Sequence, residues 1–280
     1  MRTVRTVAEL RAALARARQQ ARRIGLVPTM GAFHDGHRSL MRRARSDCDV
    51  VVVSLFVNPS QFNDDADLNA YPRDEAGDAA IAAEQNVDYL FAPATSELYP
   101  EGFDTTVSVR RLADVLEGLH RGRGHFEAVA TVVTKLFAIT GPDAAYFGQK
   151  DVQQVLVIKQ LVGDLNMPLE VVTCPTIRDA DGLALSSRNA QLTPDDRRRA
   201  LTLNRVLTAT RRLVAAGATD VATLQSAAIA ELAQNRVQLD YFQIVDPSTL
   251  EPLRVVAGPA LAVVAGSVGA VRLIDNQPLP

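Results

Sequence analysis

Short apolar runs alternate with helical sequence patterns through the first 175 residues of this 280-residue chain. The apolar runs occupy residues 24–29, 50–57, 87–92, 144–148 and 169–173, and we interpret them as strands buried on both faces. The helical patterns occupy residues 7–22, 37–45, 74–85, 129–140 and 152–162. Such alternation is typical of right-handed βαβ units, so we predict an α/β fold with a doubly wound, Rossmann-like parallel sheet.

The pattern changes after Pro175. A polar loop at residues 178–189 is followed by two helical patterns, at 193–216 and 221–232, and by three β-like runs, at 240–245, 260–265 and 270–274. We therefore predict a Rossmann-like domain at residues 1–176 and a smaller C-terminal α+β lid domain at residues 177–280.

The composition limits the partners of this chain. Its 30 basic and 32 acidic residues give a net charge of −2, which argues against nucleic acid as a partner. No apolar run approaches the roughly 20 residues of a membrane helix, so we expect no membrane segment. The N-terminus leads into an amphipathic pattern and not into a secretory signal, so we expect a cytoplasmic protein. Cys48 and Cys174 show no disulfide or redox spacing.

The segment from Met30 to His37 follows the first apolar run and contains two histidines three positions apart. A strand that ends in glycine and opens a helix turns backbone N–H groups and the positive end of the helix dipole toward its ligand, commonly a phosphate. His34 and His37 would point the same way on the first helical turn. Gly36 has no Cβ, which leaves room for a flat base. This H-x-G-H pattern is typical of adenylyl-transferring enzymes, so it predicts a nucleotide site.

Two other interpretations of these histidines stay open. His120 and His125 would complete a metal site with them, although neither cysteine has the spacing of a zinc motif. Alternatively, His34 and His37 are helix-capping residues with a structural role.

A second strand-to-helix segment, residues 145–154, places Lys150 and Asp151 after Gly148. A lysine at this position suits polyphosphate, and a carboxylate after a strand commonly accepts from ribose hydroxyls. The alternative is a surface ion pair at a helix start.

A third segment, residues 182–189, holds Ser186, Ser187 and Arg188 in a loop that begins with glycine. Two hydroxyls and a guanidinium suit an anion, whereas the alternative is a turn before a helix. The order of the three segments is that of a class I adenylating site, where histidines and a loop bind the triphosphate while a carboxylate attacks the α-phosphate.

Six groups of residues are more specific together than any common motif. They are residues 27–31 with His34 and His37, residues 54–59 with Gln61 and Phe62, residues 71–73, 124–126, 146–151 with Gln153 and Gln154, and 183–189. In this combination the chain resembles the pantoate-beta-alanine ligases. The resemblance covers the first domain and reaches the second through Asp275 and Asn276.

The resemblance implies a carbon–nitrogen ligase of pantothenate and coenzyme A biosynthesis. ATP would convert (R)-pantoate into pantoyl adenylate with release of pyrophosphate, and the amine of beta-alanine would then displace AMP. Mg²⁺ would bridge the ATP phosphates and would have no protein side chain as a ligand. The resemblance also implies a homodimer.

The resemblance assigns site residues by position. The implied catalytic residues are His34, His37, Lys150, Ser186, Ser187 and Arg188. The implied ATP-binding residues are Pro28, Thr29, Met30, His37, Phe147, Gly148, Lys150, Asp151, Leu185, Ser186, Ser187 and Arg188. The implied pantoate-binding residues are Asn58, Gln61, Gln154, Val129, Val132 and Val133. The chain departs from the family pattern at Glu127, Ala128 and Val152, which places the shape of the pantoate wall in question.

Three other functions are compatible with parts of this pattern. A nucleotidyltransferase that leaves AMP on its product shares the fold and the H-x-G-H, but it would need a second pocket for a base or phosphate. A non-enzymatic nucleotide-binding regulator would have no reason to keep the whole reactive set. An aminoacyl-tRNA synthetase would need a longer chain and a basic face.

Overall fold

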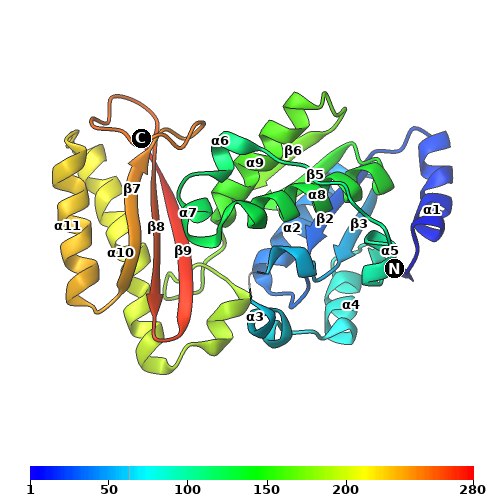
Figure 1. Cartoon of the computed structure of the whole chain (residues 1–280), viewed down its shortest axis with the longest axis horizontal. Helices are drawn as coiled ribbons and strands as arrows, with labels where there is room; N and C mark the ends of the chain where they lie inside the picture. Colours follow the sequence, from blue (N-terminus) through cyan, green and yellow to red (C-terminus); the bar gives the residue numbers. More distant parts are fainter. Residues whose placement is uncertain (63) are drawn as a thin grey trace. The chain divides into compact units, whose positions relative to one another are not determined.

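The computed structural model describes residues 1–62 and 64–280, and six of its strands form one parallel sheet (Figure 1). The strands are β1 (Arg2–Val4), β2 (Ile24–Thr29), β3 (Val50–Leu55), β4 (Tyr89–Phe91), β5 (Ala144–Gly148) and β6 (Glu170–Cys174), in the order β1-β4-β3-β2-β5-β6. The predicted α/β class with a parallel sheet is confirmed. The strand order reverses between β2 and β5, which is where ligands of such sheets bind, at the carboxyl ends of the strands.

Helices cover both faces of this sheet. The helices between its strands are α1 (Val7–Gln19), α2 (Asp35–Asp47), α3 (Asp65–Ala70), α4 (Glu75–Glu84), α5 (Thr95–Leu98), α6 (Arg110–Ala113), α7 (Glu117–Arg121), α8 (Arg123–Thr140) and α9 (Val152–Asp164). Strand residues alternate between two cores, as the pleat requires. Leu26 and Val52 pack in one core with α1, α8 and α9, and Val27 and Val53 pack in the other with α2 and α4.

The last three strands form a separate antiparallel sheet of order β7-β8-β9. They are β7 (Gln238–Val245), β8 (Ala260–Val268) and β9 (Val271–Leu279), and helices α10 (Pro194–Ala215) and α11 (Val221–Gln234) pack against them. The predicted α+β character of this region is confirmed. Its strands are longer than predicted.

The chain divides into two compact units. The first comprises Met1–Gly148 and Gln153–Pro175, and the second comprises Gln149–Val152 and Thr176–Pro280. The short segment from Gln149 to Val152 therefore belongs with the C-terminal residues, which no sequence pattern indicated. The division into domains at residue 176 stays a prediction.

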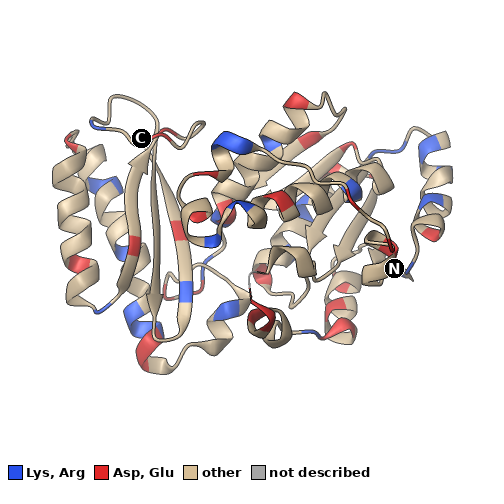
Figure 2. Ribbon diagram, viewed as in Figure 1, with Lys and Arg blue, Asp and Glu red and all other residues tan. Residues whose placement is uncertain are grey.

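Positions of basic and acidic residues are interspersed along the ribbon of each unit (Figure 2). The arginines at the start of α10 pair with aspartates: Arg197 with Asp179 and Asp181, and Arg198 with Asp195. Within the described part of the chain, no helix combines the length and apolarity needed to cross a membrane.

Candidate active site

His34 and His37 form a reciprocal cap at the start of α2. The Nδ1 atom of His34 accepts from the backbone N–H of Gly36 at 3.1 Å, and the Nδ1 atom of His37 accepts from the backbone N–H of His34 at 3.3 Å. The two ring centroids lie 4.3 Å apart. Both histidines therefore cap α2, with His34 at the N-cap and His37 on the first helical turn. Their ligand-binding role stays a prediction.

These cap bonds determine the tautomer of both rings. A nitrogen that accepts a hydrogen bond carries no proton, so each neutral imidazole is protonated on Nε2. Each neutral ring therefore carries its proton on Nε2, at the positive end of a helix that follows the central strand β2. This arrangement suits an anionic oxygen, such as one of a phosphate.

The turn before α2 is held by Asp78 of α4, a residue to which no sequence pattern assigned a role. Its side chain is buried and accepts from the backbone N–H groups of Ala32 at 2.9 Å and Phe33 at 2.7 Å. Burial raises the pKa of the Asp78 carboxyl, against the opposing effect of these two bonds. Gly31 has a φ of +93°, and a Cβ there would lie 2.6 Å from Leu55 Cδ1. The sequence did contain one sign of this role. Asp78 lies four positions before Ala82 on the same helix, so the two residues share the face that is buried.

Replacing Asp78 by alanine should destabilise the first unit by about 1–3 kcal/mol, because two backbone N–H groups would lose their acceptor. Urea unfolding of the wild type and Asp78→Ala measures this loss. Asp78→Asn keeps one acceptor oxygen, so it should show a smaller loss. Equal stability of all three proteins would contradict the role given to Asp78.

The predicted pantoate residues Asn58 and Gln61 lie together after β3, in the short helix η1 (Pro59–Gln61) and at its cap. The Nδ2 atom of Asn58 donates to Gln61 Oε1 at 3.2 Å and to the carbonyl of Ala128 at 3.4 Å. Gln61 Nε2 donates to Met30 Sδ at 3.0 Å. Asn58 is 1% exposed, and within the described residues its Oδ1 has no hydrogen-bond partner. A buried acceptor of this kind suits a donor from a ligand.

The remaining predicted site residues of the first unit lie on α8, at the ends of β2 and β5, and on α9. Val129, Val132 and Val133 are buried on α8, which packs against η1. Pro28 and Thr29 end β2, Phe147 and Gly148 end β5, and Gln154 is half-buried on α9. His125 contacts the carbonyl of Gln61 through Nδ1 at 2.8 Å. Among residues 1–62 and 64–280, no three His, Cys, Asp or Glu side chains form a group that could hold a metal ion.

The second unit carries the other predicted phosphate-binding residues. Lys150 and Asp151 lie in the short helix η2 (Gln149–Asp151), with Lys150 Nζ 3.8 Å from Asp151 Oδ2. Such a partly exposed pair contributes little to stability, so it does not explain why Lys150 is only 18% exposed. Leu185 and Ser186 lead into η3 (Ser187–Gln191), where Ser186 Oγ accepts from the Arg188 backbone N–H at 3.3 Å.

The family model for pantoate-beta-alanine ligase matches residues 2–278. The chain belongs to the pantoate-beta-alanine ligase family. The family resemblance predicted from the motifs is thus confirmed, together with the enzyme class.

Individual relatives match over nearly their whole length. The chain is 51% identical over 277 residues to a pantothenate synthetase of Moorella thermoacetica, covering 99% of this chain and 98% of the relative. The crystal structure of pantothenate synthetase from Thermus thermophilus matches with a TM-score of 0.94 and 48% identity over 99% of both chains. The pantoate-beta-alanine ligase from Francisella tularensis, complexed with beta-gamma ATP and beta-alanine, matches with a TM-score of 0.83 and 36% identity over 99% of this chain and 97% of that one.

Proposed function

We propose that this protein joins pantoate to beta-alanine using ATP and thereby forms pantothenate, AMP and pyrophosphate. The observation that carries the proposal is the family match across residues 2–278. We further propose that the reaction proceeds through pantoyl adenylate with Mg²⁺ on the ATP phosphates, and that the enzyme acts in the cytoplasm as a homodimer.

In the first unit, His34 and His37 would donate from Nε2 to phosphate oxygens of ATP, with help from the backbone N–H of Met30. The cap bonds at Nδ1 support this role because they fix the donor nitrogen. The turn held by Asp78 would keep this donor set in place before ATP arrives.

Pantoate would bind beside η1. Gln61 and Gln154 would hold its hydroxyls and carboxylate, since neutral amides both donate and accept. The buried Oδ1 of Asn58 would accept from a pantoate hydroxyl. Val129, Val132 and Val133 would contact its methyl groups.

In the second unit, Lys150, Ser186, Ser187 and Arg188 would bind the ATP phosphates, and Asp151 would bind the ribose. Gly148, at the end of β5 in the first unit, has a predicted role in ribose binding as well. A carboxylate oxygen of pantoate attacks the α-phosphorus, and pyrophosphate leaves. The free amine of beta-alanine then attacks the acyl carbon. The bond between that carbon and the phosphate oxygen breaks, AMP leaves with the bonding electrons, and the nitrogen loses one proton to solvent. Cationic and N–H donors stabilise the charge that develops on the phosphates.

Gln61→Ala and Gln154→Ala should each raise the KM for pantoate more than the KM for ATP, because both amides would face the acid. Steady-state kinetics with each substrate varied in turn measures the two constants. An equal rise of both would place the pantoate pocket elsewhere.

The function itself is tested by product analysis with ATP, Mg²⁺, pantoate and beta-alanine, each omitted in turn. Pantothenate and AMP should form only with all substrates present. A nucleotidyltransferase would instead yield a stable product that retains AMP.

A further inference from the structure

Two adjacent polar residues of β9, Asp275 and Asn276, are almost fully buried, at 5% and 3% exposed. Buried polar groups of this kind require partners. Successive strand residues face opposite sides of a sheet. Asp275 therefore shares its face with Val271 and Leu273, which pack in the core of the second unit, and Asn276 has the other face.

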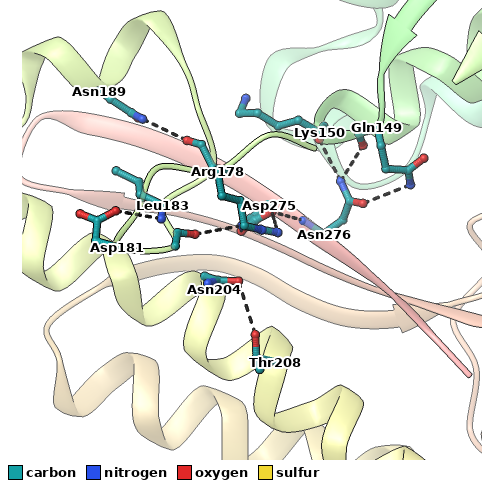
Figure 3. A network of polar contacts seen from close by, with 12 residues as sticks. Gln149, Lys150, Arg178, Asp181, Leu183, Asn189, Asn204, Thr208, Asp275 and Asn276 are labelled. Carbon is teal, nitrogen blue, oxygen red and sulfur yellow. Dashed lines mark hydrogen bonds and ion pairs between the residues drawn. The ribbon is translucent and has the colours of Figure 1, made fainter. Parts of the chain in front are cut away.

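The amide of Asn276 holds the backbone of η2 (Figure 3). Its Nδ2 atom donates to the carbonyls of Gln149 and Lys150, both at 2.9 Å, and its Oδ1 accepts from Gln149 Nε2 at 3.2 Å. Among side chains of this length, only that of asparagine supplies both N–H donors and an acceptor oxygen for these three bonds. Asn276 thus fixes the main chain from which the Lys150 side chain extends.

The carboxylate of Asp275 holds the hairpin that precedes Ser186 (Figure 3). It accepts from Arg178 Nη1 at 2.6 Å and Nη2 at 2.9 Å, and from the Asn276 backbone N–H at 2.8 Å. Arg178 also donates to the carbonyl of Gly182 at 3.3 Å and pairs with Ala184 across the hairpin. A bidentate pair between a half-buried arginine and a buried carboxylate defines geometry more strictly than a single hydrogen bond.

We propose that Asp275 and Asn276 are positioning residues that fix, from one strand, the two segments of the second unit that bind ATP phosphates. The proposal rests on the phosphate-binding roles proposed above for Lys150 and for residues 186–188. Displacement of a charge-stabilising group by about 1 Å can lower a rate by around 100-fold, so a pair that contacts no substrate can still control turnover.

The test compares Asn276→Leu and Asn276→Asp with Thr210→Val. Leucine removes the hydrogen bonds while keeping the branching and the number of side-chain heavy atoms, and aspartate places a carboxylate against two carbonyls. The control Thr210 is 3% exposed and donates to the Val206 carbonyl at 2.8 Å within α10, so its loss is purely structural. Urea unfolding measures the free energy of unfolding of each variant, and calorimetry measures the Kd of a non-hydrolysable ATP analogue.

Both Asn276 variants should raise the Kd of the analogue and lower kcat by at least tenfold, with the KM for pantoate within about twofold of wild type. Thr210→Val should leave all three constants nearly unchanged. If the Asn276 variants do not fold, Gln149→Ala and Arg178→Lys replace them. These variants should also raise the Kd of the analogue and lower kcat, but by smaller factors.

Folded variants with wild-type Kd and kcat would overturn the proposal, and so would equal losses in Thr210→Val. The analogue separates this outcome from a failure of the proposed function. A wild type that binds the analogue but forms no pantothenate would remove the function, while weaker binding in the variants would still support the positioning role.

Discussion

Replacing Lys150 by alanine is expected to lower kcat by two or more orders of magnitude and to leave the fold intact. The ammonium group would stabilise charge that develops on the phosphates, and loss of one such donor costs about 3–4 kcal/mol of transition-state stabilisation. The fold should persist because the bond from Asn276 engages only the Lys150 backbone carbonyl. Steady-state kinetics and thermal unfolding measure the two effects.

Lys159→Ala is the matched control, since Lys159 is an exposed lysine on α9. It should retain wild-type turnover. Near-wild-type turnover in Lys150→Ala would remove Lys150 from the catalytic set.

His37→Ala should also lower turnover by two or more orders of magnitude, but alanine removes the cap bond and the Nε2–H donor together. Glutamate separates the two, because a Glu at this third helical position accepts from the cap residue in an ordinary capping box. His37→Glu should therefore keep the stability of the wild type and be as inactive as His37→Ala. His37→Gln caps the helix and still offers an N–H donor, so it should retain part of the activity.

Urea unfolding and kcat are measured for the wild type and the three His37 variants. An active His37→Glu would mean that His37 serves only as a cap. An unstable His37→Glu would mean that the cap bond does not transfer to a carboxylate.

The central strands were predictable from the sequence because both of their faces are buried. β2 and β5 begin and end at the predicted residues, since their apolar runs are continuous. β1 was missed because only Val4 among its three residues is buried. The start of α8 was predicted six residues too late, because its first turn, after Gly122, is polar and carries no apolar period.

The residues of the candidate site also differ in how far they could be predicted from the sequence. His34, His37 and Lys150 were recognisable from local spacing, since each lies at a strand-to-helix junction. Asp78 and Asn276 were not assigned a role, because they act on backbone groups 45 to 127 positions away and no local pattern records such bonds. The substrate contacts of the site residues stay predictions.

The most direct measurement is exchange of labelled pyrophosphate into ATP, with saturating ATP and pantoate, Mg²⁺ present and beta-alanine absent. If pantoate is activated as an adenylate before the amine arrives, label should enter ATP and the exchange should stop when pantoate is omitted. Absence of pantoate-dependent exchange in a wild type that still forms pantothenate would contradict the adenylate and favour a concerted ligation that needs all three substrates.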